Sequence, residues 1–417
     1  MKKATVIYLG CPKNLVLSEN LLGVLNSSGY KLTPPEEAEV AFLLSCGFIK
    51  DAKKETIENL CYLKKLKSEK KLKKIVFTGC MADYYKDKLK KEFPEIDEII
   101  NPEEILKYFK TKEKRIITTG VYAYLKIAEG CDHKCSFCII PYLTGPYKSK
   151  KIEEILKEAK DIESLNVKEI NLIAQDLTQY GKDLYGKQML YQLLEELLRD
   201  TKFQWIRMLY LYPEKFPLNI IKLMKKNERI LPYFDLPFQH VSKNVLKKME
   251  RGGNYKAFLN LINKIRQEIP NSIIRSTFIL GFPGEKEEDF EELKNFLIEA
   301  KLDRVGFFIY SDEPESKSFK LPNKIPKKVA KKRLYELARI QKVISFENHK
   351  KFIGKKLEFL LEMRKGEIGW GRLKSQAPEI DGYVKINALD ENFEGIGIVE
   401  INRVSAYNFF GRYYENL

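Results

Sequence analysis

The sequence predicts an α/β protein in three parts: an N-terminal parallel βαβ domain, an open barrel of six βα units and a small antiparallel β-barrel at the C-terminus. Apolar runs of strand length alternate with helical segments through most of the chain, which is typical of parallel sheets. After residue 354 short strands separated by Gly and turn residues take over, as in a small barrel. We expect domains at residues 1–115, 120–348 and 350–417.

The N-terminal part has the pattern of a βαβαβ unit, which implies a parallel sheet. Strands are expected at residues 4–9, 40–44 and 74–78, and helices at residues 14–28, 51–67 and 83–93. A further helix and a charged linker cover residues 102–114, and a domain boundary is expected near Gly120.

The middle part alternates in the same way. Strands are expected at residues 124–128, 169–173, 205–209, 233–236, 273–279 and 304–309, with helices at residues 152–164, 190–199, 254–267 and 287–300. Six βα units are too few for the usual closed eight-stranded barrel, so a partial, open (βα)6 barrel is expected. A long helix over residues 327–351 then leads to tail strands at residues 356–361, 382–386 and 397–402.

Composition narrows the class of protein. The chain has 417 residues and a net charge of +16, and it lacks an apolar run of 18 residues, so we expect no membrane-spanning helix. The apolar segment at residues 4–9 is too short for a signal peptide, and we expect a soluble, cytoplasmic protein, by default a monomer. A basic surface favours an anionic partner such as a ribosome or tRNA, although solvated lysine faces would look the same. Seven cysteines and three histidines favour metal or redox chemistry over disulfides.

Three cysteines follow the first three expected strands: Cys11, Cys46 and Cys80. Because the carboxyl ends of parallel strands lie along one edge of a sheet, these thiols are expected to converge there. Three thiols without a histidine suit an iron–sulfur cluster better than a structural zinc, while three buried structural cysteines are the alternative. Cys61 falls in a helical segment and is expected in the core.

Three more cysteines form a CxxxCxxC motif after the first barrel strand: Cys131, Cys135 and Cys138. A four-iron cubane held by three thiolates keeps one iron open. That iron can chelate S-adenosylmethionine, and an electron from the cluster can cleave it to methionine and a 5′-deoxyadenosyl radical. The motif is the signature of the radical S-adenosylmethionine superfamily. A zinc knuckle is the alternative, but His133 lies between the cysteines at a cramped spacing.

The two cysteine sets followed by a small barrel resemble the methylthiotransferases over essentially the whole chain. Further matching segments are residues 9–14, 123–131, 172–176, 235–240, 281–285 and 376–382. The resemblance implies an N-terminal domain with an auxiliary 4Fe-4S cluster, a barrel with the radical 4Fe-4S cluster and a terminal TRAM domain. Two segments depart from the family pattern: Leu17 replaces the usual Asp, and residues 311–315 replace Glu-Glu-Gly-Thr, where we expect only local loop effects.

The resemblance also implies a mechanism in which one S-adenosylmethionine methylates sulfur on the auxiliary cluster and another generates the radical. The radical takes hydrogen from the β-carbon of the substrate, which then captures the methylthio group. No catalytic residue is expected beyond the cluster ligands. Gln175 and Asp176 are candidates for the ribose or amino end of S-adenosylmethionine, or for strand-end capping. Arg275 is a candidate for contact with a carboxylate, or for an ordinary surface role. Gly281 and Gly284 are candidates for backbone approach to the adenine, with turn formation as the alternative.

Within the family, the motifs resemble the branch that modifies an aspartate of small-subunit ribosomal protein twelve. The tRNA adenosine branch, which is the alternative, usually has Gln-Met-Asn where Pro12, Lys13 and Asn14 stand. From residue 355 onwards we count nine basic and ten acidic residues, a net charge of −1, which suits a basic protein better than tRNA. A non-catalytic iron–sulfur protein is the third hypothesis. The leading one also requires an electron donor such as ferredoxin or flavodoxin.

Overall fold

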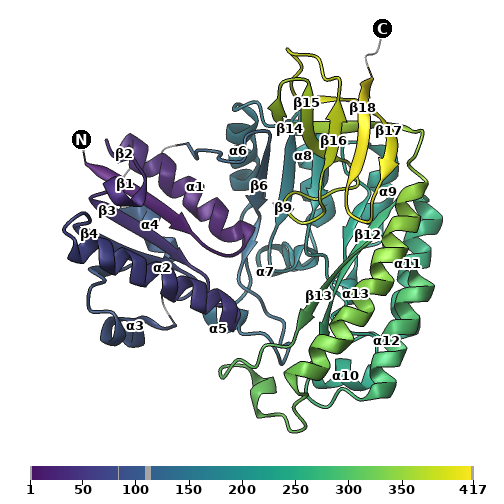
Figure 1. The fold of residues 1–417 in the computed structure, drawn as a ribbon, viewed down its shortest axis with the longest axis horizontal. Coiled ribbons are helices and arrows are strands. Elements are labelled where there is room, and N and C mark those ends of the chain that lie inside the picture. Colours follow the sequence, from purple (N-terminus) through teal and green to yellow (C-terminus); the bar gives the residue numbers. More distant parts are fainter. Residues whose placement is uncertain (1, 83, 109–113, 415–417) are drawn as a thin grey trace.

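The computed structural model describes residues 2–82, 84–108 and 114–414. Much of the expected charged linker, residues 109–113, and position 83 in an expected helix lie outside these ranges. Figure 1 shows the N-terminal sheet on one side, the barrel in the centre and the small C-terminal barrel above it. Among the described helices, none has the length and apolar character needed to cross a bilayer.

The N-terminal unit is a parallel five-stranded sheet in the order β2-β1-β3-β4-β5. The three expected strands are β1 (Lys3–Tyr8), β3 (Val40–Ser45) and β4 (Lys74–Gly79). Two short edge strands were not expected, β2 (Lys31–Leu32) and β5 (Glu98–Ile99). The helices are α1 (Pro12–Ser27), η1 (Pro35–Glu37), α2 (Lys50–Ser68), α3 (Lys86–Glu92) and α4 (Pro102–Tyr108). Helix α3 is shorter than the expected residues 83–93.

Helices cover both faces of this sheet. Leucines of α1 pack with α4 on one face, and those of α2 pack with α3 on the other. The middle strand β3 is buried from Ala41 to Ser45 and is apolar along nearly its whole length, as a strand covered on both faces should be. The sheet therefore offers only its edges and strand ends to the rest of the protein.

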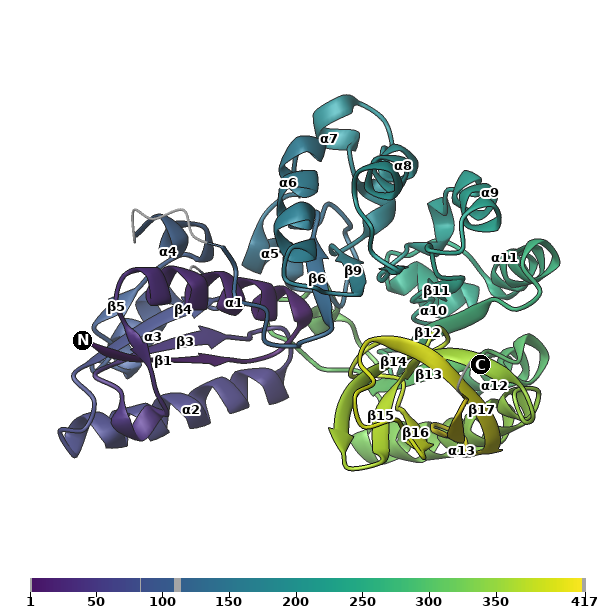
Figure 2. The same cartoon turned by 90° about the horizontal axis from the view of Figure 1, so that it is seen from above.

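The middle unit is the expected open barrel. Its six strands are β6 (Tyr122–Lys126), β9 (Glu169–Ile173), β10 (Trp205–Met208), β11 (Tyr233–Asp235), β12 (Ile273–Leu280) and β13 (Arg304–Ile309). They form two parallel three-stranded groups, β6-β9-β10 and β11-β12-β13, joined by a bridge between Ile206 and Ile230. No pairing joins β6 to β13 in the described chain, so the barrel is open, as Figure 2 shows from above.

Helices surround these strands: α5 (Ile140–Thr144), α6 (Ile152–Glu163), α7 (Lys182–Tyr185), α8 (Leu190–Asp200), α9 (Asn219–Lys226), α10 (Lys243–Lys248), α11 (Tyr255–Glu268) and α12 (Glu287–Ala300). Three 3-10 turns accompany them: η2 (Leu177–Gln179), η3 (Pro213–Lys215) and η4 (Lys317–Lys320). Strand β6 ends two residues before the expected position, because the chain turns into an antiparallel hairpin of β7 (Ala128–Glu129) and β8 (Lys148–Ser149).

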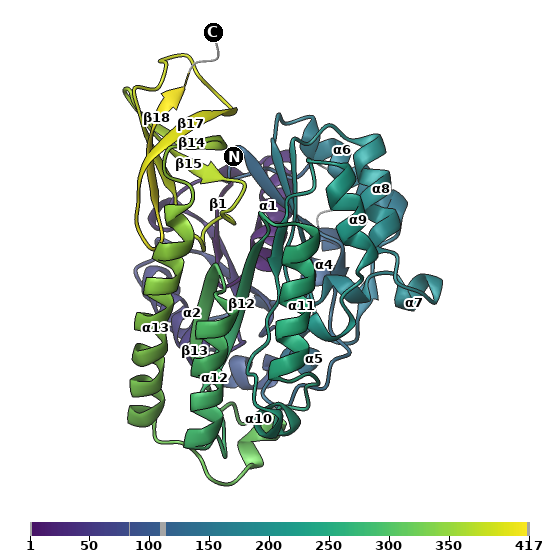
Figure 3. The same ribbon diagram turned by 90° about the vertical axis from the view of Figure 1, so that its right-hand side faces the viewer.

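Helix α13 (Lys327–Lys350) runs along the barrel to the C-terminal unit, as Figure 3 shows. That unit is a closed barrel of β14 (Lys356–Lys365), β15 (Ile368–Leu373), β16 (Val384–Asn387), β17 (Ile396–Val404) and β18 (Phe409–Tyr414). The expectation of a purely antiparallel barrel needs one correction, because β16 and β18 are parallel. The unexpected strands β15 and β18 carry glycines; a Cβ on Gly371 would lie 2.0 Å from the Leu360 oxygen of the neighbouring strand.

A buried ionic cluster joins the small barrel to the central one. Glu169 of β9 accepts hydrogen bonds from Arg207 Nε at 2.8 Å and from Arg372 Nη2 of the small barrel at 2.5 Å. Nearby, Tyr233 donates to Asp381 Oδ2 at 2.5 Å. Because Glu169 is fully buried, this cluster fixes the orientation of the C-terminal unit through charges that cannot be left unpaired.

Candidate active site

A cavity of about 1320 Å³ lies between the N-terminal unit and the central barrel. These two units face each other in Figure 2. The wall contains six of the seven cysteines: Cys11, Cys46, Cys80, Cys131, Cys135 and Cys138. Both predicted cysteine sets are therefore open to one chamber.

The first cysteine set lies at the carboxyl ends of neighbouring strands β1, β3 and β4: Cys11, Cys46 and Cys80. Asn14, buried in the first turn of α1, ties two of these ends together. Its Nδ2 donates to the carbonyl oxygens of Leu9 at 2.7 Å and Ser45 at 3.0 Å. Ser45 Oγ donates to the carbonyl oxygen of Thr78 at 2.7 Å, which links β3 to β4. These three hydrogen bonds hold the strand ends without a sulfur atom, and Asn14 Oδ1 also accepts a long contact from Cys80 Sγ at 3.9 Å.

Burial is the main influence on the thiol pKa values of this set. Burial, then repulsion from the thiolates of Cys11 and Cys46, raises the pKa of Cys80 to about 12. The pKa of Cys46 is raised as well, also chiefly by burial, and the Lys13 charge acts in the opposite direction on both thiols. A thiolate here is costly unless a cation accompanies it, and an iron cluster would supply that positive charge.

The second cysteine set lies on the loop between β7 and α5: Cys131, Cys135 and Cys138. Gly130 starts this loop at φ +73°, and a Cβ there would lie 1.9 Å from a carbonyl oxygen of the facing loop. Ser136 fixes the loop from behind: its N donates to Met249 O at 2.9 Å, and its O accepts from Ser318 N at 2.8 Å. Burial raises the pKa of Cys131 to about 11 and of Cys138 to about 12.

A stack of three side chains supports this loop. The His133 ring lies on the Tyr212 ring at 3.9 Å and 7°, and the Arg251 guanidinium lies 4.1 Å from the same Tyr212 ring. Arg251 Nη1 also lies 3.9 Å from Cys135 Sγ. Asp176 holds the other side of His133, with Oδ2 2.7 Å from Nε2. The histidine within the motif therefore orients the loop, and its carboxylate partner is a residue that we had considered for S-adenosylmethionine.

The three polar candidates for S-adenosylmethionine, Gln175, Asp176 and Arg275, have different environments in the structure. Gln175 and Arg275 line the cavity, and Arg275 Nη1 donates to Asp235 Oδ1 at 2.8 Å. Asp176 is 1% exposed; besides His133, it accepts from the backbone N and hydroxyl of Thr178 and so caps η2. The capping alternative thus describes what Asp176 does in this structure.

The two glycine candidates lie in the loop after β12, close to helices. A Cβ on Gly281 would lie 2.5 Å from Ala330 Cβ of α13, and one on Gly284 would lie 2.5 Å from Lys248 Nζ. Both have φ near +75°. Their glycine identity is explained by turn formation and close packing, and neither lines the cavity that holds the cysteines.

Several cavity residues were not found as site residues from the sequence. Lys13, Tyr210, Tyr212 and Arg251 line the chamber together with the cysteines. Lys13 and Asn14 stand in a matched motif, which was a usable signal. Tyr210 and Tyr212 follow β10 at its carboxyl end, where barrel active sites form, and this position could also have indicated them.

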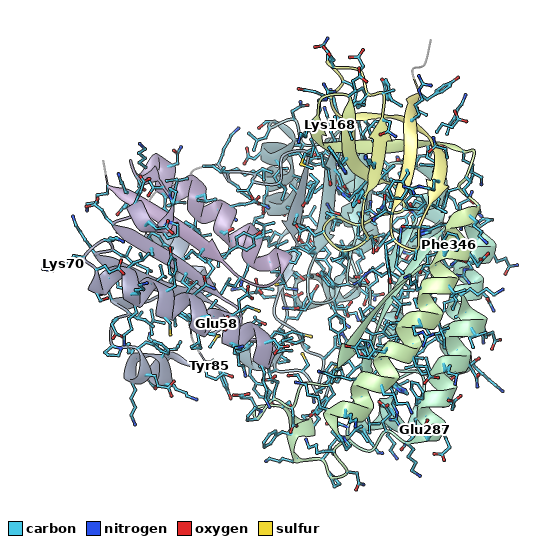
Figure 4. The ribbon with its side chains drawn as sticks, viewed as in Figure 1. Glu58, Lys70, Tyr85, Lys168, Glu287 and Phe346 are labelled. Carbon is cyan, nitrogen blue, oxygen red and sulfur yellow. The ribbon has the colours of Figure 1, made fainter. Side chains whose placement is uncertain are left out.

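The segment 311–315 was expected to have only local effects, and this expectation is wrong. Glu313, 1% exposed, accepts from the backbone N of Lys50 and from Lys53 Nζ, each at 2.8 Å. Glu315 accepts from Tyr85 OH at 2.7 Å and from Lys53 Nζ at 3.3 Å. All three partners belong to the N-terminal unit; Figure 4 labels Tyr85 at its lower end. The segment therefore docks the N-terminal unit onto the barrel.

Two other expectations can be compared with the structure. Cys61 was expected in the core but is exposed on α2, away from both sets. Leu17 lines the cavity, so an apolar side chain stands where the family usually has an acid. Within the described ranges, no three Cys, His, Asp or Glu side chains are spaced to hold a single metal ion.

The open barrel with a CxxxCxxC loop at the mouth of its strands defines a radical S-adenosylmethionine enzyme. The Radical SAM superfamily model matches residues 125–297, and membership brings with it a 4Fe-4S cluster and S-adenosylmethionine. Two further models match, Uncharacterized protein family UPF0004 at residues 3–101 and the TRAM domain at residues 353–413.

Full-length relatives narrow the family. The chain is 44% identical to the ribosomal protein uS12 methylthiotransferase RimO of Aquifex aeolicus (strain VF5), covering 100% of this chain and 98% of that protein. It is 43% identical to the enzyme of the same name from Clostridioides difficile (strain 630), covering 99% and 98%. The chain belongs to this RimO family of radical S-adenosylmethionine methylthiotransferases.

Solved structures agree on the fold. The radical S-adenosylmethionine methyltransferase TsrM from Kitasatospora setae superposes with a TM-score of 0.55 at 11% identity, covering 76% of this chain and 77% of that one. The cobalamin-dependent radical enzyme OxsB gives 0.51 at 13% identity, covering 81% and 56%. At such low identity these likenesses concern the fold alone.

Proposed function

We propose that this enzyme methylthiolates the β-carbon of an aspartate in small-subunit ribosomal protein uS12. The single observation that carries the proposal is the shared cavity, which has one cysteine set on each side. A reaction that needs a radical source and a sulfur donor requires both at one substrate. The relatives named for this activity and the near-neutral C-terminal unit add support.

We assign the second set, Cys131, Cys135 and Cys138, to the radical cluster and the first set, Cys11, Cys46 and Cys80, to an auxiliary 4Fe-4S cluster. The two donor sets fit, since each offers three thiols to the cavity. The remaining cysteine, Cys61, is exposed and does not line the cavity. When bound, these clusters and S-adenosylmethionine would supply reductive cleavage and the sulfur for transfer.

The protein's own residues would orient these groups. Gln175 and Arg275 are the remaining cavity candidates for S-adenosylmethionine, and the Asp235 carboxylate beside Arg275 could hold its amino group. Asp176 would act through His133 on the cysteine loop, and Gly281 and Gly284 through the shape of the loop after β12.

The wider assignments belong to the same proposal. Domains at residues 1–115, 120–348 and 350–417 fit the three sets of strands. Ferredoxin or flavodoxin would supply the electron, and the enzyme would act as a cytoplasmic monomer, since ribosomal proteins are made and assembled there.

The test offers both candidate substrates to one enzyme. Protein reconstituted anaerobically with iron and sulfide receives S-adenosylmethionine, reductant and either unmodified uS12, small subunits or tRNA, followed by mass spectrometry. We expect a methylthio mass gain on one aspartate peptide. A gain on a tRNA adenosine would refute the substrate and favour the alternative branch, and no formation of 5′-deoxyadenosine would refute the enzyme class.

A further inference from the structure

Lys13 is a cation in the wall of the cavity that both cysteine sets line, and no mechanism step has used it. It stands two residues after Cys11 and lines the cavity. Its Nζ lies 3.5 Å from the carbonyl oxygen of Ala174, at the end of β9, and 4.8 Å from the centre of the Tyr210 ring. One side chain thus reaches from the N-terminal unit to the barrel across the chamber.

Other cavity cations have partners. Lys126 pairs with Glu129, Lys150 Nζ lies 2.6 Å from Glu158, and Arg275 Nη1 lies 2.8 Å from Asp235. Arg251 donates to the Pro237 carbonyl oxygen and covers Tyr212.

Lys13 differs from the three ion-paired cations, because no carboxylate of the described chain lies within ion-pair distance of its Nζ. Arg251 shares this feature, but its guanidinium lies against the Tyr212 ring, 3.9 Å from Cys135 Sγ. A carbonyl oxygen and a ring face satisfy an ammonium only in part. Its surroundings add to this imbalance, since Lys13 lies in the first turn of α1, where the helix dipole disfavours a cation, and that turn contains no acidic residue. The Lys13 charge acts on the thiols of Cys46 and Cys80, and an incoming anion would supply the carboxylate partner that the described chain does not give it.

We propose that Lys13 binds the carboxylate of the substrate aspartate and selects an acidic side chain over its neutral isostere. The inference rests on the proposed function. The carbon that reacts is bonded directly to the carboxylate carbon, so a cation that binds the carboxylate also fixes the reacting carbon. A cation in the wall of this cavity would hold that carbon in the chamber that both sets line.

The experiment compares uS12 with its target aspartate and uS12 in which that aspartate is replaced by asparagine. Wild-type enzyme is expected to prefer the aspartate protein by about 100-fold in kcat/KM, because asparagine leaves the ammonium unpaired. Lys13→Met should lower kcat/KM for the aspartate protein by about 100-fold, mainly through KM, and change the asparagine reaction only a few-fold. Lys13→Arg should recover part of the preference. Lys31→Met, an exposed lysine on edge strand β2, is the matched control and should behave as wild type.

A binding measurement adds a readout that does not depend on turnover. Without S-adenosylmethionine, the Kd of the aspartate protein should rise in Lys13→Met, while that of the asparagine protein should hardly change. Equal losses on both substrates would overturn the inference, as would an unchanged preference. If Lys13→Met fails to fold, the comparison of wild-type enzyme on the aspartate and asparagine proteins still tests the inference. Equal kcat/KM values on the two proteins would overturn the inference. A product on tRNA alone would overturn the proposed function as well, and the product itself distinguishes that case.

Discussion

The docking contact made by Glu313 gives a prediction that can be worked out from the structure. Glu313→Gln keeps the shape of the side chain but removes the charge that faces Lys53 and the first backbone N–H of α2. Two charge-assisted hydrogen bonds are weakened in a buried place. Lys53 retains Glu315 at 3.3 Å, so the cost should fall below that of a fully orphaned buried charge, at about 2–3 kcal/mol.

That energy changes the ratio of separated to docked N-terminal units by roughly 30- to 150-fold. The assay measures methylthio product per 5′-deoxyadenosine formed, together with the rate of limited proteolysis between the two units. We expect the product ratio to fall and cleavage to accelerate. Glu37→Gln, which removes one partner of an exposed pair with Lys3 in the same unit, is the control. Wild-type values of both readouts in Glu313→Gln would refute the reasoning.

The remaining predictions concern clusters, stability and pH. Cys135→Ala should abolish S-adenosylmethionine cleavage and remove roughly half the iron, whereas Cys46→Ala should remove a similar share but retain cleavage; identical iron loss and identical cleavage in both variants would contradict separate clusters. Glu169→Gln leaves buried Arg207 without a carboxylate partner and Arg372 with Glu362 alone, and it should lower the free energy of unfolding by about 3 kcal/mol in urea titrations; an unchanged free energy would contradict a buried, water-free cluster. Burial, then the nearby Arg304, lowers the pKa of His349 to about 3 from 6.5. The unfolded chain therefore binds this proton first, and stability should be lost as the pH falls below about 6.5, by about 2 kcal/mol at pH 5. Replacing His349 with Gln should flatten that part of the pH profile, and an unchanged slope would count against the assignment.

Local patterns in the sequence predicted the features that depend on neighbouring residues, namely the main strands and helices and the residues at their ends. Apolar strands and helical periodicity gave the three units, and the position of Cys46 directly after a buried strand was enough to place it at the sheet edge. The edge strands β2 and β5 were missed because two residues carry no period. Strand β15 was missed because its glycines weaken strand propensity while serving close packing.

Long-range partners could not be predicted in this way. The carboxylate of Asp176 is occupied by His133, and Glu313 reaches a helix more than 250 residues earlier in the chain. No spacing rule connects such positions, because the contacts depend on how separate units pack. For the same reason the chemistry of Lys13 became visible only once its neighbours were known.

The hydrogen bonds of Asn14 and Ser45 bear on how the enzyme is assembled and repaired. They join the ends of β1, β3 and β4 through nitrogen and oxygen atoms, so under the proposed assignment a protein without its auxiliary cluster would keep these three thiols together. In this it differs from zinc fingers, which unfold without their metal. A cluster lost to oxygen would then be replaced by inserting new iron and sulfide into a protein that is still folded. The same closeness would expose free thiols to cross-linking, so under this assignment shielding from oxidants would matter most between synthesis and cluster delivery.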